Sequence, residues 1–201
     1  MEPTLLPNFG IHQKIIPQSL YLPLLRECKK AEKKNPKMIS GLTGKGVAPH
    51  YYITNPTNLR LLKKYLQEMK REYDTAFPGL GETGVLSKSL NYKCDSPWIN
   101  IQRKGQLLPI HTHDGIYSYT IWMQIPYDIK EERADSGCAG VFEFHYSTIF
   151  GAPMAYSIPL SKKNEGTIIM FPAKLKHCVY PFYTSSKTRI SIAGNLLYDA
   201  G

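Results

Sequence analysis

Two histidines stand two positions apart in the stretch PIHTHDGIYSYTIW, which covers Pro109 to Trp122. Side chains alternate between the faces of a β-strand, so in one strand His111 and His113 project from the same face, about 6 to 7 Å apart at the backbone. Both imidazoles can then reach one metal ion. Asp114 faces away while the strand continues, but it can turn back to the same ion if the strand ends at His113. The pattern leaves open which of the two residues would join His111 in a metal site.

A second set of candidate residues lies in the last third of the chain. His177 begins a strand-like run after the Phe-Pro turn of GTIIMFPAKLKHCVYPF, and Arg189 and Ser191 share one face of the run KTRISIAGN. Apolar neighbours at 190, 192 and 193 indicate a buried strand, where an unpaired guanidinium is costly. The partner of Arg189 is either a structural carboxylate or a bound anion. Beside the histidines, the pattern favours a bound carboxylate ligand.

The elements that must position these residues change in character along the chain. Asn55 as a cap, Pro56 in the first turn and apolar residues every three or four positions predict an amphipathic helix that ends before Pro78, and a shorter helix is expected from Pro23 to Asn35. From about Ser87 the sequence consists of short strand-like runs separated by Gly, Pro and polar turns.

These runs predict a mainly β fold with packed helices (α+β): a jelly-roll or cupin-like core supported by N-terminal helices. We expect one domain over residues 1–201, with helical and loop support in 1–86 and the sheet core with the metal site in 87–201.

Composition excludes several other classes of protein. With 42% hydrophobic and 20% charged residues the chain is typical of a globular protein, and no run reaches the ~18 apolar residues of a membrane span. The N-terminus lacks the features of a signal peptide, so we expect a cytoplasmic location. The net charge of +9 includes a lysine cluster at 29–37 that Glu32 interrupts, which is typical of a solvated helix face. Nucleic-acid binding is therefore not favoured, whereas an anionic substrate is. Nothing in the sequence indicates an oligomeric state.

Taken together, the HxH element, the distal His after a Gly-hydrophobic-Phe-Pro run and the following RxS resemble the Fe(II) and 2-oxoglutarate-dependent dioxygenases. The likeness covers roughly Trp98 to Asn195, and it is greatest to the short versions found in phage and marine bacterial genomes; a phage origin would place the chain in the host cytoplasm. The resemblance implies a double-stranded β-helix that uses Fe(II), 2-oxoglutarate and O2 to hydroxylate a C–H bond of a small-molecule or peptide substrate. Succinate and carbon dioxide would be the coproducts.

The resemblance also implies a set of metal ligands. His111 matches the first metal ligand of the family and His177 the distal one. The usual third ligand is a carboxylate two residues after the first histidine, and this chain has His113 there. We expect a three-histidine site, with Asp114 as the alternative carboxylate ligand.

Arg189 and Ser191 match the pair that binds the far carboxylate of 2-oxoglutarate, so Arg189 counts with the three histidines as catalytic. Tyr119 and Asn100, on strands beside the metal element, are further candidates for binding the cosubstrate. His145 and Cys178 are interpreted as packing residues, His145 alternatively as part of the substrate wall.

Two other functions are alternatives to the dioxygenase that the resemblance implies. One is a non-catalytic jelly-roll binding or phage structural protein, which would have no use for a buried arginine beside the histidines. The other is a cupin-type metalloenzyme, which would bind metal but not 2-oxoglutarate.

Overall fold

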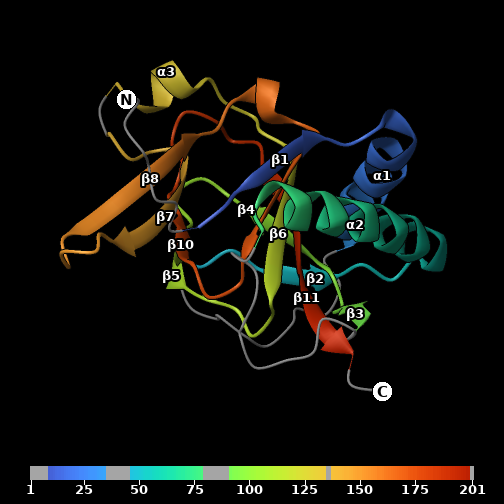
Figure 1. Ribbon diagram of the computed structural model, residues 1–201. Coiled ribbons are helices and arrows are strands. Elements are labelled where there is room, and N and C mark those ends of the chain that lie inside the picture. The colour runs from blue at the N-terminus through green and yellow to red at the C-terminus, as the bar shows by residue number, and fades with distance from the viewer. Residues whose placement is uncertain (1–8, 35–45, 79–90, 135–136, 200–201) are drawn as a thin grey trace.

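The computed structural model describes residues 9–34, 46–78, 91–134 and 137–199 (Figure 1). In chain order the elements are β1 (His12–Ile15), α1 (Gln18–Lys34), β2 (His50–Tyr52), α2 (Pro56–Ala76), β3 (Asn91–Cys94), β4 (Trp98–Gln102), β5 (Leu108–His111), β6 (Tyr117–Gln124), α3 (Ile129–Glu132), β7 (Val141–Ser147), β8 (Pro153–Pro159), the 3-10 turn η1 (Lys162–Asn164), β9 (Thr167–Pro172), β10 (Lys176–Val179) and β11 (Arg189–Asp199). The predicted fold class, mainly β with packed helices, is confirmed.

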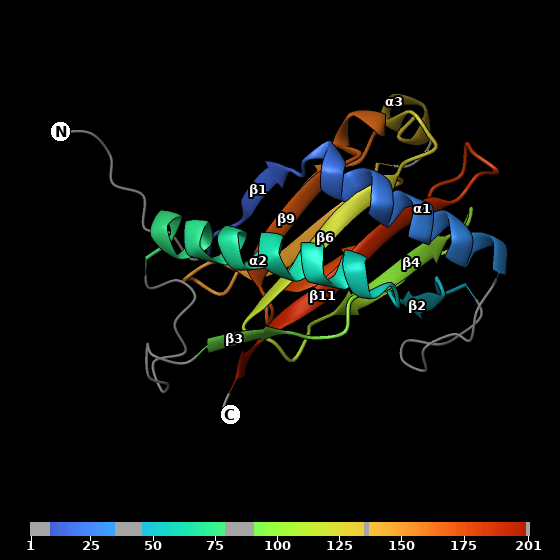
Figure 2. The ribbon, with the colours of Figure 1, turned by 90° about the vertical axis from the view of Figure 1, so that its right-hand side faces the viewer.

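The strands form two antiparallel sheets. The larger sheet has seven strands in the order β1-β9-β6-β11-β4-β2, with β3 paired to β11 beyond the end of β4. The smaller sheet has four strands in the order β5-β10-β7-β8. Helices α1 and α2 lie across the larger sheet on the side away from the smaller one (Figures 1 and 2). The result is the two-sheet architecture of a jelly roll.

The long helix α2 forms as its sequence predicts. The side chain of Asn55 accepts hydrogen bonds from the backbone N–H groups of Thr57 at 2.9 Å and Asn58 at 3.1 Å, which satisfies two of the free donors of the first turn. Its apolar residues at three- and four-residue spacing, among them Leu62 and Leu66, are buried against the sheet. None of the described helices combines the length and apolarity that crossing a membrane requires.

Helix α1 begins five residues earlier than predicted, at Gln18, and contains Pro23 instead of starting there. The carbonyl of Pro17 accepts hydrogen bonds from the N–H groups of Leu20 and Tyr21, both at 2.9 Å, and so closes the first turn. Burial of Leu20 and Leu24 on either side of Pro23 offsets the backbone hydrogen bond that proline cannot donate. Tertiary packing therefore overrides the local preference.

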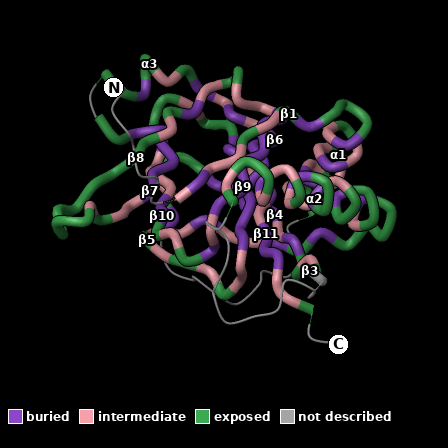
Figure 3. The backbone as a smooth tube through the Cα atoms, viewed as in Figure 1, coloured by how far each residue is buried: buried purple, intermediate pink, exposed green. Residues whose placement is uncertain are grey.

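Three strands were not expected: β1, β2 and β8. The stretch 1–86, expected to supply helices and loops, also supplies β1, which pairs with β9, and β2, which pairs with β4. Both are short and lie at the edges of the larger sheet. β8 is exposed along most of its length, as Figure 3 shows, so it lacks the apolar alternation that marks a half-buried strand.

The larger sheet has two buried faces. Ile190, Ile192 and Leu196 of β11 belong to the core between the sheet and the helices. Arg189 and Ser191, which alternate with these apolar residues along the strand, belong to the opposite face, toward the smaller sheet. A second core lies between the two sheets and consists mainly of the aromatic residues Trp122, Tyr127, Phe142, Phe144, Phe171 and Phe182. The space between the sheets is where the candidate site is built.

Candidate metal centre

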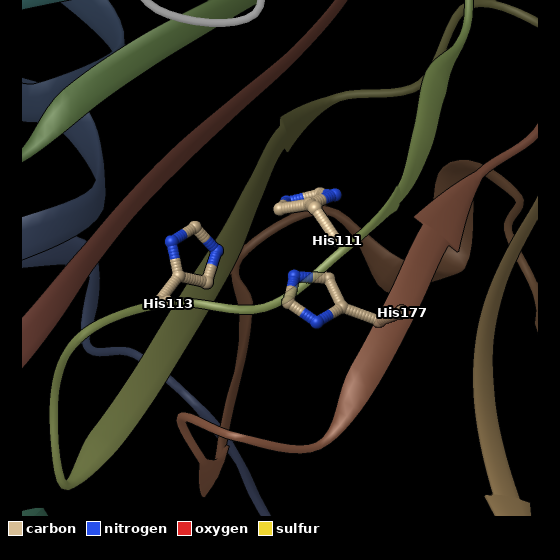
Figure 4. A group of neighbouring side chains, drawn as sticks. All are labelled: His111, His113 and His177. Carbon is tan, nitrogen blue, oxygen red and sulfur yellow. The ribbon is translucent and has the colours of Figure 1, made fainter.

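Three histidines meet at the end of the smaller sheet. His111 on β5 and His177 on β10 are directly opposite in the antiparallel pair, and their ring centroids lie 4.3 Å apart. The His113 ring lies 4.9 Å from that of His111 and 5.1 Å from that of His177. One nitrogen from each ring lies within 4.8 Å of the others, and Figure 4 shows the three rings turned toward a common point. The fold thus brings together the three predicted ligands.

Backbone carbonyls fix the orientation of two of the rings. The Nδ1 of His111 lies 2.7 Å from the carbonyl oxygen of Pro109, and the Nδ1 of His177 lies 2.9 Å from that of Leu175. A carbonyl only accepts, so each Nδ1 carries the hydrogen. The Nε2 lone pair of each ring is then free to bind a metal, which is the usual outer-shell arrangement of metal-bound histidines.

The three imidazoles are held in their neutral, metal-binding form. Burial, together with the neighbouring His111, lowers the pKa of His113 to about 4 and that of His177 to about 3. Burial also lowers the pKa of His111. A transition-metal ion therefore need not displace protons from these rings near neutral pH.

His113 reaches the site from a loop and not from the strand. β5 ends at His111, so strand alternation is not what orients His113. Its backbone N–H instead donates to the carbonyl of Ala173 at 3.0 Å, and its ring lies 5.5 Å from that of Trp98. The residue reaches its predicted place by a different route.

Asp114 lies outside the cluster. Its side chain is fully exposed, and its carboxylate accepts a hydrogen bond from the exposed Lys174 ammonium at 3.0 Å. Although the strand ends early, the loop turns this carboxylate toward solvent. The structure gives no support to Asp114 as the alternative ligand.

Arg189 is buried at the other end of the same space, with 3% of its surface exposed. Its Nε and Nη2 donate to Gln102 Oε1 at 3.0 and 2.6 Å, Nη1 donates to the Tyr127 hydroxyl at 2.6 Å, and Nη2 donates to the Tyr180 carbonyl at 2.6 Å. All these acceptors are neutral. No carboxylate forms an ion pair with this guanidinium within the described ranges, so its charge is left for a ligand to neutralise.

A cavity of about 380 Å³ joins the arginine to the histidines. Ser191, next but one to Arg189, lines it and accepts a hydrogen bond from Asn100 Nδ2 at 3.2 Å. The Oδ1 of Asn100 and the Nε2 of His50 are buried and have no hydrogen-bond partner in the part of the chain that the structure describes. Trp122, with other aromatic residues, supplies the apolar wall. Unpaired buried polar atoms in a cavity indicate that a polar ligand belongs there.

Tyr119 does not direct its hydroxyl to this site. The ring belongs to the core between the larger sheet and the helices, and its hydroxyl lies 3.9 Å from Cys94 Sγ. A Cβ at Gly194, the residue opposite in β11, would lie 2.5 Å from that hydroxyl, so the phenol occupies the helix side of the sheet. Although Tyr119 is among the residues that line the cavity, the alternation of β6 directs its hydroxyl to the other face, which does not support the prediction that this hydroxyl binds the cosubstrate.

The tyrosine whose hydroxyl contacts Arg189 is Tyr127, which was not among the predicted site residues. It lies in the segment after β6, stacks on Phe182 with ring centroids 5.0 Å apart, and donates its own hydroxyl hydrogen to the Gly140 carbonyl at 3.1 Å. Gln102, which accepts two hydrogen bonds from the guanidinium, was likewise not predicted as a site residue. It lies on the same face of β4 as Asn100, so strand alternation could have found Gln102 but not Tyr127.

Residues 96–195 match a protein-family model described as "Putative 2OG-Fe(II) oxygenase". The matched stretch covers about half of the chain and contains the three histidines, Arg189 and Ser191. The chain belongs to the 2OG-Fe(II) oxygenase family. Membership implies Fe(II), 2-oxoglutarate and O2 as cofactor and cosubstrates.

Solved structures of other 2-oxoglutarate oxygenases share the fold of this family member. A prolyl-4-hydroxylase from Pseudomonas putida is 14% identical, with a TM-score of 0.60, and the match covers 95% of this chain and 94% of the other. A prolyl hydroxylase from Trichoplax adhaerens, in complex with a peptide of a hypoxia-inducible factor, is 12% identical with a TM-score of 0.59, covering 95% and 83%. The carbocyclase SnoK from nogalamycin biosynthesis is 12% identical with a TM-score of 0.62, covering 96% and 81%. A comparison with curated proteins found no match.

The donor set fits the iron of this family with one difference. Three neutral imidazoles replace the two histidines and one carboxylate that are usual at such centres. Imidazole is a good ligand for iron, and both strand histidines already present free Nε2 lone pairs. The residues present therefore suit a transition-metal ion with open positions.

Proposed function

We propose that the chain is a single-domain oxygenase in which His111, His113 and His177 hold Fe(II) while Arg189 and Ser191 bind the far carboxylate of 2-oxoglutarate. One observation carries the proposal: neutral histidines and a buried, unneutralised guanidinium line the same cavity. A buried charge without a counterion lowers the stability of a protein. A non-catalytic jelly roll would gain nothing from a buried arginine beside three histidines, so this combination favours an enzyme.

In this proposal each part of the cavity has a distinct task. Bound Fe(II) would supply the oxidative chemistry by which O2 converts 2-oxoglutarate to succinate and CO2 and hydroxylates a C–H bond of the substrate. Arg189, held by Gln102 and Tyr127, orients the cosubstrate, and Ser191 adds a hydroxyl contact. The aromatic wall around Trp122 keeps water away and so strengthens these electrostatic contacts.

A site of three neutral ligands leaves the full double charge of Fe(II) uncompensated by the protein. It therefore attracts anionic groups more strongly than a site with one carboxylate ligand does. We propose that this favours binding of the 2-oxoglutarate dianion, which would bring the missing negative charge into the cavity.

For the substrate we propose a small molecule or a peptide with anionic character. The support is the net charge of +9 and the likeness of fold to a prolyl hydroxylase that was solved with a peptide. The cytoplasmic location stays a prediction from the sequence.

The test is optical and needs no substrate. Protein loaded with Fe(II) and 2-oxoglutarate without oxygen should develop the visible charge-transfer band of a chelated keto acid, and admission of air should release succinate. His111→Ala should abolish both, while Asp114→Ala, a change at the neighbouring exposed acid, should keep both. Bound iron without the band would favour the cupin-type alternative, and failure to bind iron would favour a non-catalytic jelly roll.

A further inference from the structure

A second cluster of metal-ligating side chains lies on the smaller sheet. Glu143 of β7 and Cys178 of β10 are directly opposite in the antiparallel pair, and His145 follows two residues along β7. The Nε2 of His145 lies 3.4 Å from the sulfur of Cys178 and 3.2 Å from a carboxylate oxygen of Glu143. One donor atom from each residue lies within 4.8 Å of the others.

This cluster is separate from the three histidines. His177 packs against the rings of Phe142, Phe144 and Phe171 between the two sheets, with centroids 5.0 to 6.2 Å away. Cys178 follows His177, and Glu143 follows Phe142, so both turn to the outer face of the smaller sheet. The sheet itself separates the two groups.

The arrangement does not suit a proton relay. In a nucleophile–base–acid relay the two imidazole nitrogens contact different partners, one the thiol and the other the carboxylate. Here both partners face the same nitrogen, Nε2 of His145. A single nitrogen cannot at once accept from the thiol and donate to the carboxylate, so the three donors converge on one point.

The separations instead match the edges of a tetrahedral metal site. Bonds of about 2.3 Å to sulfur and about 2.0 to 2.2 Å to nitrogen and oxygen put tetrahedral S···N and N···O edges at about 3.5 and 3.4 Å. The observed values are 3.4 and 3.2 Å. These two edges need to lengthen only slightly to admit an ion, and the third pair, the Cys178 sulfur and a Glu143 carboxylate oxygen, lies within 4.8 Å.

The surroundings supply what a bound cation requires. Glu143 is buried, and the only basic group within ion-pair distance among the described residues is His145. The Ser157 hydroxyl donates to one oxygen of Glu143 at 2.5 Å and the Tyr180 hydroxyl to the other at 3.2 Å, which fixes the carboxylate as outer-shell partners do. The side chain of His145 is 26% exposed, so an ion can enter from solvent.

We propose that Glu143, His145 and Cys178 form a second metal site, for Zn²⁺ or a similar borderline-soft divalent ion, that links β7 to β10. Thiolate, imidazole and carboxylate are the ligands that zinc uses in proteins, and three of them leave one tetrahedral position for water. This replaces the interpretation of His145 and Cys178 as packing residues. The ion stabilises the strand pair that carries His177 on its inner face, and the site does not depend on the oxygenase function.

Cobalt(II) distinguishes the two sites, because only the second contains sulfur. Protein stripped of metal and titrated with Co(II) should develop a near-ultraviolet thiolate-to-cobalt charge-transfer band, which added Zn²⁺ should abolish. His111→Ala, which disrupts the three-histidine cluster, should keep the band. Cys178→Ser and the more exposed His145→Ala should lose it, and Cys94→Ser, a matched change of a thiol on β3 of the larger sheet, should retain it.

Zinc content provides a second, independent readout. The His111→Ala protein should retain about one zinc ion per chain after dialysis, and the added change Cys178→Ser should remove it while circular dichroism shows an intact fold. A folded wild-type protein that shows no thiolate band at saturating Co(II), or a Cys178→Ser protein that keeps the full band, would overturn the proposal. Neither result would affect the charge-transfer test of the oxygenase site.

Discussion

Replacement of Arg189 by glutamine tests the cosubstrate site most directly. The described hydrogen bonds use one of the two hydrogens on Nη1, so the other has no acceptor in the described residues and can point to a ligand carboxylate. A charge-assisted hydrogen bond contributes about 1.5 to 3 kcal/mol. Taking about 3 kcal/mol, because the buried charge is otherwise unneutralised, Arg189→Gln should weaken 2-oxoglutarate binding roughly a hundredfold.

Thermal denaturation without oxygen, with Fe(II) present, measures this effect. At a 2-oxoglutarate concentration about 100 times the wild-type Kd, the ligand should stabilise the wild-type protein by about 2.7 kcal/mol, a rise in Tm of roughly 5 to 11 °C. At the same concentration the variant should gain only about 0.4 kcal/mol, or roughly 1 to 2 °C.

Ligand-induced shifts are compared because Arg189→Gln also changes the stability of the free protein. The substitution leaves the Gln102 Oε1 acceptor without its donors on Arg189, at about 1 to 3 kcal/mol, and removes an unneutralised charge, which acts in the opposite direction. Arg103→Gln, a change at an exposed arginine, is the matched control and should keep the full shift. Iron content should be unchanged in both variants. A full shift in the Arg189→Gln protein, or an equal loss in the control, would refute the assignment.

His113→Ala should lower iron content as measured by elemental analysis, whereas Asp114→Ala should leave it unchanged; the reverse pattern would assign the carboxylate as the third ligand. Burial lowers the pKa of His50 to about 4 from its ordinary 6.5, so the unfolded chain binds more protons between these values. The metal-free protein should therefore lose stability as pH falls through this window, by up to about 1.4 kcal/mol per pH unit from this residue. The free energy of unfolding of His50→Gln, measured in urea at several pH values, should decrease less steeply over the same window. Gly194→Ala should lower the free energy of unfolding by about 1 to 3 kcal/mol, because its Cβ would meet the Tyr119 hydroxyl, and adding Tyr119→Phe should recover part of the loss; no recovery would contradict the placement of that phenol.

Several local features of the fold and of the candidate site could be predicted from short stretches of the sequence. Helix α2 is determined by a capping side chain and a repeating apolar face, both of which are set within a few residues. Likewise, the one-residue spacing between Arg189 and Ser191 in β11 puts both on one face whatever the rest of the chain does. The three histidines could be predicted as candidate metal ligands because the HxH element, the distal histidine and the following RxS occur together, whereas the HxH spacing alone is weak evidence.

The assignment of residues to faces was decided by tertiary structure. All but the last residue of β6 is buried, because both faces of the larger sheet are covered, so its sequence has no polar alternation to show that Tyr119 faces the helices. The turn after His111 is set by a backbone hydrogen bond to Ala173, from a distant part of the chain, and this contact directs His113 inward while Asp114 faces solvent. Contacts between segments far apart in sequence, which no local pattern encodes, likewise bring Tyr127 to Arg189.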